Sequence, residues 1–244
     1  MGAAPNRRAT EEAAMPADPR LIVALDLPTI GEAEALVERL GDQVGFYKVG
    51  LELLATGGME LAKRLTRSGL SVFADWKLSD IGNTVQRATA AIAATEACAF
   101  LTVHGEPKSM QAAVQGRGSS PMKLLAVTVL TSLDDADLKE MGYAFSARDL
   151  VERRVRQAIE AGFDGVISSP HEAAVARRLG GPNFLVVTPG IRPSGAALGD
   201  QARAAGPTDA LRNGASHLVV GRPINAAADP RAAAEAIVAE MAGA

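Results

Sequence analysis

"LSVFADWKLSDIGNTV" (residues 70–85) starts as an apolar run of strand-forming residues and ends in a group of charges. The run at 70–78 indicates a buried strand, and a segment of helical period follows it at 84–96. Asp75, Lys77 and Asp80 lie within six positions of one another, where this strand ends. Because an unpaired charge is costly to bury, these three side chains need partners.

The same unit of strand and helix recurs along the chain. Eight apolar, β-rich runs predict strands at residues 20–27, 44–50, 70–78, 98–105, 123–130, 165–170, 184–190 and 217–223. Segments of helical period lie at 31–40, 58–68, 84–96, 147–161, 171–179, 208–213 and 229–242. An open, doubly wound sheet is disfavoured, because "ALDLPTIGEAE" (24–34) has no phosphate-binding glycine cluster after the first strand. Eight units in roughly 225 residues instead predict one α/β domain, a (β/α)8 TIM barrel over residues 20–244.

Composition and charge limit the classes of partner. The 244 residues are 48% hydrophobic with a net charge of -3, and the dispersed basic residues argue against nucleic-acid binding. No apolar run is long enough to cross a membrane, so no membrane association is expected. The single cysteine, Cys98, is expected to be a buried, inert thiol in a reducing cytoplasm. Residues 1–19 carry Glu11 and Glu12 where a signal peptide would be apolar, so we expect a disordered, dispensable tail.

Polar residues gather where the predicted strands end, which in such barrels is the catalytic face. They are Asp26, Lys48, Asp75, Lys77, His104, Thr131, Ser132, Ser168, Ser169, Gly221 and Arg222. Since the carboxyl ends of all eight strands open on one side, we expect these side chains to converge on one mouth.

Asp75 and Lys77 are two positions apart on a strand, so both should face the barrel lumen, while Trp76 packs outward against a helix. A structural ion pair is the simplest alternative, but an isolated buried pair seldom repays its desolvation. Lys48 and Asp80 can complete an array of two cations and two anions, which favours catalysis. Asp26, taken alone, fits a structural role as a cap of the following loop or helix as well as it fits a functional one.

A second site is indicated after the last two strands. The segment 188–210, rich in glycine and proline, is longer than such loops usually are and fits a lid. Gly221 permits close backbone approach and Arg222 offers a fork of donors, so a phosphate site is expected there, with an ordinary surface loop as the alternative. The three histidines, His104, His171 and His217, show no metal-ligand spacing and are expected to be structural.

Over residues 20–240 the chain resembles the orotidine 5'-phosphate decarboxylase family. The motifs that carry the resemblance are "ALD" (24–26), "KVG" (48–50), D-x-K-x-x-D-I-x-N-T (75–84), "AVTVLTS" (126–132), "TPGIRP…GDQ" (188–201) and "VVGRP" (219–223). The family more often has His and Pro where this chain has Ser79 and Gly82. Neither of these positions belongs to the charged group.

The resemblance implies decarboxylation of orotidine 5'-phosphate to UMP in a cytoplasmic homodimer, with no cofactor and no metal. It assigns a catalytic tetrad of Lys48, Asp75, Lys77 and Asp80, in which Asp80 and Thr84 reach into the partner's site. It also implies substrate-binding roles, with Asp26 at the ribose, Thr131 and Ser132 at the pyrimidine, Pro189 lining the pocket, and Arg192, Gln201, Gly221 and Arg222 at or near the phosphate.

Two other functions stay open at this stage. One is a magnesium-dependent enzyme of the same barrel group, such as a hexulose-phosphate synthase or a keto-gulonate-phosphate decarboxylase, which EDTA would inhibit. The other is a non-catalytic phosphate-ligand binder, since a fold does not determine function.

Overall fold

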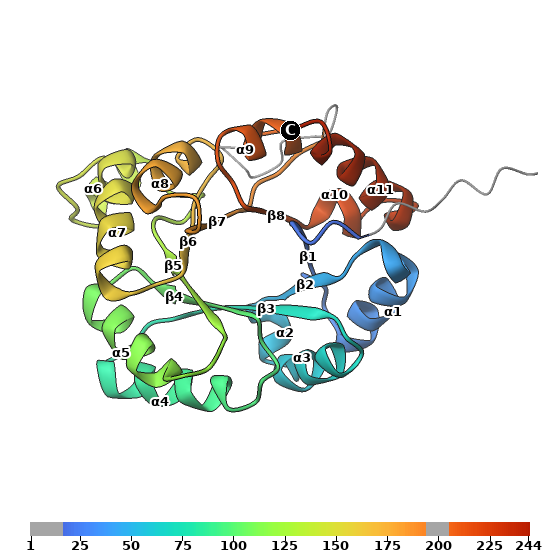
Figure 1. Ribbon diagram of the computed structural model, residues 1–244, viewed down its shortest axis with the longest axis horizontal. Helices are drawn as coiled ribbons and strands as arrows, with labels where there is room; N and C mark the ends of the chain where they lie inside the picture. The colour runs from blue at the N-terminus through green and yellow to red at the C-terminus, as the bar shows by residue number, and fades with distance from the viewer. Residues whose placement is uncertain (1–16, 194–204) are drawn as a thin grey trace, which may run out of the picture.

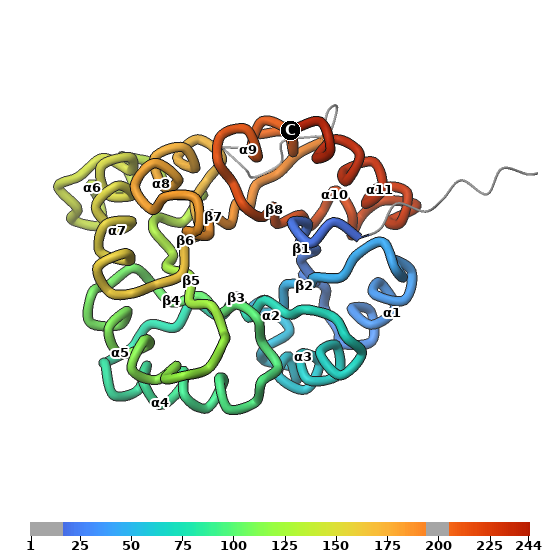
Figure 2. Tube along the Cα trace, in the orientation of Figure 1, coloured from blue at the N-terminus to red at the C-terminus, as the bar shows by residue number. Residues whose placement is uncertain are grey.

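Eight parallel strands close into a barrel in chain order, as the view down the barrel in Figure 1 shows. The structure is a computed structural model that describes residues 17–193 and 205–244. The strands are β1 (Leu21–Ala24), β2 (Phe46–Val49), β3 (Ser71–Leu78), β4 (Phe100–His104), β5 (Lys123–Val127), β6 (Gly165–Ile167), β7 (Leu185–Thr188) and β8 (His217–Val220). Figure 2 shows β1 beside β8, where Leu21 pairs with Leu218 and Val23 with Val220 to close the ring. The predicted barrel and all eight predicted strands are confirmed.

Helices surround the ring and cover its outer face (Figure 1). They are α1 (Ile30–Leu40), α2 (Leu51–Leu54), α3 (Gly58–Arg67), α4 (Gly82–Ala93), α5 (Pro107–Arg117), α6 (Asp135–Glu140), α7 (Ala147–Ala161), α8 (Ala173–Gly180), α9 (Pro207–Arg212), α10 (Arg222–Asn225) and α11 (Pro230–Met241), with a 3-10 turn at Gly41–Gln43. Four of them, α2, α5, α6 and α10, lie outside the ranges that helical period predicts. Helix α5 buries small residues such as Ser109, Ala112 and Ala113, which leave only a weak apolar pattern in the sequence.

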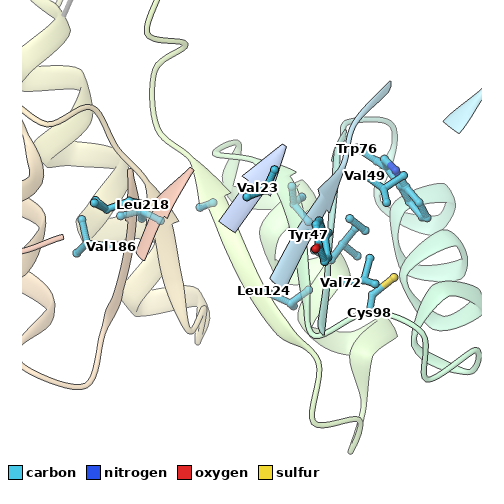
Figure 3. Packing of buried hydrophobic residues seen from close by; sticks show 14 of the residues in the cluster. Val23, Tyr47, Val49, Val72, Trp76, Cys98, Leu124, Val186 and Leu218 are labelled. Carbon is cyan, nitrogen blue, oxygen red and sulfur yellow. The ribbon is translucent and has the colours of Figure 1, made fainter. Parts of the chain in front are cut away.

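Strand alternation divides the core in two. Side chains on the outer face of the strands pack under the helices, and Figure 3 labels Tyr47, Val72, Trp76 and Leu218 among them. Trp76 is 6% exposed in this layer, so the prediction that it packs outward is confirmed. A separate inner cluster fills the lumen and consists of Ile22, Ala24, Phe46, Phe73, Phe100, Leu125, Val187 and Val219.

Aromatic rings form the floor of the lumen. Phe100 lies edge-on to Phe46 and Phe73, with ring centroids 4.9 and 6.0 Å apart, and His217 lies edge-on to Phe100 at 5.2 Å. Burial lowers the pKa of His217 to about 4, so its ring is neutral near pH 7 and packs as an aromatic side chain. This agrees with its predicted structural role. Because alternate residues share a face, the next inward residue on β2, β3 and β4 stands one layer above this floor.

Two further predictions concern Cys98 and the N-terminal tail. Cys98 is a buried free thiol, so its predicted burial is confirmed, and burial raises its pKa to about 12, which disfavours the reactive thiolate. Of the expected tail, residues 1–16 lie outside the described residues, while Asp18 forms an ion pair with Arg20 at 2.7 Å. Within residues 17–193 and 205–244, no helix has the length and apolar character needed to span a membrane.

Candidate active site

Four charged side chains form an unbroken row at the mouth of the barrel. Asp26 follows β1, Lys48 belongs to β2, and Asp75 and Lys77 belong to β3. The Lys48 Nζ lies 2.8 Å from Asp26 Oδ1 and 3.5 Å from Asp75 Oδ2. The Lys77 Nζ lies 2.9 Å from Asp75 Oδ1. Two ammonium groups therefore alternate with two carboxylates, and the row as a whole has no net charge.

Burial makes these charges depend on one another. Lys48 is 7% exposed, and the side chain of Asp75 is 14% exposed. Burial alone would raise the pKa of Asp75, but the charges of Lys48 and Lys77 and its hydrogen bonds hold that pKa below its usual value. Burial alone would lower the pKa of Lys48, but Asp75 and Asp26 raise it above its usual value. Both groups are therefore ionised at neutral pH.

The membership of the row differs in one position from the predicted tetrad. Asp26 occupies the fourth place, and no ion pair between Asp80 and Lys48 or Lys77 occurs within the described chain. Asp80 lies beyond the end of β3, is exposed, and accepts a hydrogen bond from its neighbour Ile81 N–H at 2.6 Å. Thr84 is exposed on α4. Within one subunit, then, the structure brings together three of the four predicted tetrad members.

The sequence analysis did not single out Thr102, a fully buried residue of β4 that contacts the row. Its Oγ1 donates to Asp75 Oδ1 at 3.0 Å and accepts the Lys77 backbone N–H at 2.9 Å. The sequence contains a signal for this role: Thr102 is two residues before His104 and two after Phe100, so all three share the lumen face of the strand. Threonine is also a common β-strand residue, and this made the signal weak.

The row borders a cavity of about 710 Å³, a volume within the usual range for small-molecule sites. Nine of the predicted site residues line it, namely Asp26, Lys48, Asp75, Lys77, Thr131, Pro189, Arg192, Gly221 and Arg222. Ser132 is exposed and, like Asp80 and Thr84, is not among the lining residues. Gln201 falls outside the described residues.

Two arginines also line the cavity. Arg192 follows β7, and Arg222 opens α10 directly after its N-cap, Gly221. Burial and the nearby charge of Arg222 lower the pKa of Arg192. Two guanidinium groups lining one cavity suit a dianion such as a phosphate ester.

Comparisons with known proteins agree with this geometry. Residues 19–237 match the family described as "Orotidine 5'-phosphate decarboxylase / HUMPS family". The chain belongs to this family. An orotidine 5'-phosphate decarboxylase from Caulobacter vibrioides is 66% identical over 94% of this chain and 100% of its own length, and one from Rhodopseudomonas palustris is 58% identical over 93% and 97%. The predicted family is thus confirmed.

Solved structures support the fold independently of the sequence motifs. The crystal structure of orotidine 5'-phosphate decarboxylase from Lactobacillus acidophilus superposes with a TM-score of 0.80 at 39% identity, covering 92% of this chain and 99% of that one. An uncharacterized conserved protein from Geobacillus kaustophilus gives a TM-score of 0.78 at 31% identity, covering 91% and 99%. This chain therefore shares the barrel of both solved structures over nearly their full length.

The glycine of "KVG" leaves space for the charged row. A Cβ at Gly50 would lie 2.9 Å from Asp26 Oδ1 and 3.1 Å from Lys48 Nζ, closer than ordinary van der Waals contacts. Both of these atoms are at the ends of side chains, so Gly50→Ala should leave the barrel folded but displace the pair. We expect kcat/KM for orotidine 5'-phosphate to fall by about tenfold or more, which corresponds to a loss of about 1.4 kcal/mol.

The matched control is Gly31→Ala on α1, where a Cβ would meet no atom within 4 Å. Decarboxylation followed by UV absorbance, and thermal unfolding, would be measured for both variants. A Gly50→Ala enzyme as active as the control would contradict the steric role of this glycine.

Proposed function

We propose that the mouth of this barrel decarboxylates orotidine 5'-phosphate to UMP, a step of pyrimidine synthesis, and that fixed charges of the protein drive the reaction. The activity rests on family membership and on 66% identity to a named decarboxylase across its whole length. The observation that carries the mechanism is the row of Asp26, Lys48, Asp75 and Lys77 along the cavity. We also propose a cytoplasmic location, and the free thiol of Cys98 is consistent with it.

The chemistry of the substrate explains why positive charge is needed. Decarboxylation breaks the bond between C6 and the carboxylate carbon and leaves the electron pair on C6. That pair occupies an orbital in the ring plane, where the π system cannot delocalise it. An ammonium about 4 Å from a unit negative charge contributes roughly 4 kcal/mol at an effective dielectric constant of 20.

Lys77 is our candidate for this ammonium and for the proton donor to C6. Its side chain is 28% exposed and lines the cavity, so its Nζ is accessible to a bound ligand. Transfer of one proton from Nζ to C6 completes UMP, and solvent then returns a proton to the lysine. Electrostatic stabilisation by a charge already in place needs no reorganisation during the reaction.

The other members of the row orient Lys77 and the substrate. Asp75, beside the departing carboxylate, would raise the free energy of the bound substrate relative to the transition state. Lys48 holds Asp75 and Asp26 in place through its two ion pairs. Asp26, whose side chain is 53% exposed, is placed to bind the ribose hydroxyls.

The phosphate and the base would occupy the rest of the cavity. Arg192, Arg222 and the backbone of Gly221 would bind the phosphate, as would Gln201, which lies outside the described residues. The residues Thr131, Ser132 and Pro189 would contact the pyrimidine. Binding energy from a phosphate remote from C6 can lower the barrier if it is expressed as the transition state forms.

We further propose a homodimer in which Asp80 and Thr84 complete the partner's site. Both residues are exposed, and Ile81, between them, is 73% exposed although it is a large apolar residue. The proposal rests on the resemblance to the family, and the exposure of these three residues leaves them accessible to a second chain. In this arrangement Asp80 would bind the partner's charged row, which it does not contact within its own chain.

The activity can be tested directly against the metal-dependent alternative of the same family. Purified protein should remove the UV absorbance of orotidine 5'-phosphate and form UMP, with the same rate after dialysis against EDTA. The two carboxylates of the row already bind lysine ammonium groups, which disfavours their use as ligands of a hard cation. No turnover of orotidine 5'-phosphate, or turnover only after Mg²⁺ is added back, would contradict the proposed function.

Hybrid dimers test the shared site. Lys77→Ala and Asp80→Ala homodimers should each be nearly inactive. In a hybrid of the two variants, one site has both defects, while the other has Lys77 from one chain and Asp80 from its partner. After free exchange of equal amounts, about half the dimers are hybrids, and activity should rise to about a quarter of the wild-type value.

Differently tagged chains would confirm that subunits exchange. If exchange occurs and activity does not return, Asp80 serves its own subunit and the shared site is wrong. As a negative control, mixing Lys77→Ala with a differently tagged Lys77→Ala chain should restore no activity.

A further inference from the structure

The strand that carries Asp75 and Lys77 is interrupted at these residues. Ala74 pairs with Leu101 of β4, and the next paired residues are Leu78 and Val103. Three residues of β3 therefore lie opposite a single residue of β4, Thr102. Such a bulge bends the strand and removes backbone hydrogen bonds, and bulges occur often beside active sites.

Lys77 has an unusual backbone conformation within this bulge. Its φ is 48°, in the left-handed region that residues other than glycine seldom adopt. A residue in this conformation needs surrounding contacts to hold it there. Thr102 supplies one of them, because its Oγ1 accepts the Lys77 backbone N–H at 2.9 Å.

The same hydroxyl also binds the Asp75 side chain. A threonine hydroxyl has one proton to donate and two lone pairs to accept with. Since one lone pair receives the Lys77 N–H, the proton can go to Asp75 Oδ1 at 3.0 Å or to the Ala74 carbonyl at 3.5 Å. The shorter contact, to a charged acceptor, is the stronger one.

We propose that Thr102 is a positioning residue for the decarboxylation, which fixes the Asp75 carboxylate and the Lys77 backbone so that the Lys77 ammonium points into the cavity. The inference rests on the proposed roles of Asp75 and Lys77. Thr102 itself is not among the residues that line the cavity. Thr102 is fully buried on β4, opposite the bulge of β3, and acts through its contacts with Asp75 and Lys77.

Position affects the rate because a misplacement of about 1 Å can lower a rate by about 10²-fold. Without the hydroxyl, Asp75 keeps its ion pairs with Lys48 and Lys77, so both charges remain in the site. The loss should therefore affect the transition state more than substrate binding. A falling kcat with an almost constant KM is the expected signature.

Thr102→Val removes the hydroxyl and keeps the shape of the side chain. We expect kcat to fall by about 10- to 100-fold, KM to change less than about threefold, and Thr102→Ser to restore at least half of the wild-type kcat. If Thr102→Val does not fold, Thr102→Cys gives the same test, because a thiol is a weak hydrogen-bond donor and acceptor.

The matched control is Thr89→Val on α4. Thr89 is equally buried, and its Oγ1 donates to the Val85 carbonyl at 2.8 Å, so this variant also loses a buried hydroxyl contact. It should lower the melting temperature and leave kcat unchanged. Thermal unfolding of all variants separates stability from positioning.

Three results would overturn the role of Thr102: a kcat within twofold of wild type for the hydroxyl-free variant, an equal loss of kcat in Thr89→Val, or no recovery in Thr102→Ser. Failure of the proposed function is a different outcome, because the wild-type protein would then not decarboxylate orotidine 5'-phosphate at all.

Discussion

The charges in the barrel lumen are stable only as a group. A lysine as buried as Lys48 would lose its proton or destabilise the fold if it stood alone, and a buried Asp75 carboxylate would be as costly. The alternating row resolves this, since each ammonium lies beside a carboxylate. Removing one member takes an ion-pair partner from its neighbour, so the members of the row depend on one another. The rest of the site is arranged around it.

The barrel supplies the support that such a row requires. Phe46, Phe73 and Phe100 fill the floor, and the next inward residues of the same strands are Lys48, Asp75 and Thr102. The closed sheet holds these strands in a fixed register, with Lys48 paired to Phe73 across β2 and β3. The two arginines of the cavity come from different elements, the segment after β7 and the start of α10. The charged row and the arginines therefore line one cavity from different parts of the chain.

Much of this follows from the sequence because period and alternation are local properties. Eight apolar runs located the strands, and a spacing of two placed Asp75 and Lys77 together on the lumen face with Trp76 outside. Strand ends then identified most of the residues that line the cavity.

Other features depend on relations between strands, which local patterns do not contain. The bulge in β3 arises from its register with β4, so the left-handed Lys77 and its contact with Thr102 could not be read from either strand alone. The place of Asp26 in the row depends on how β1 and β2 meet. Among the helices that helical period did not predict, α5 packs mainly through small residues, which leave little periodic signal in the sequence.

The central claim is that the charge of Lys77 stabilises the transition state. The most direct test is kcat/KM for Lys77→Met, which keeps an unbranched side chain one atom shorter and removes its charge. The matched control is Lys63→Met on α3, which removes a lysine that is ion-paired to Glu60 at 2.7 Å on the surface. A contribution of about 4 kcal/mol predicts a loss of about 10³-fold or more for Lys77→Met in a folded protein, and no change for the control. A folded Lys77→Met enzyme within tenfold of wild type would contradict the account.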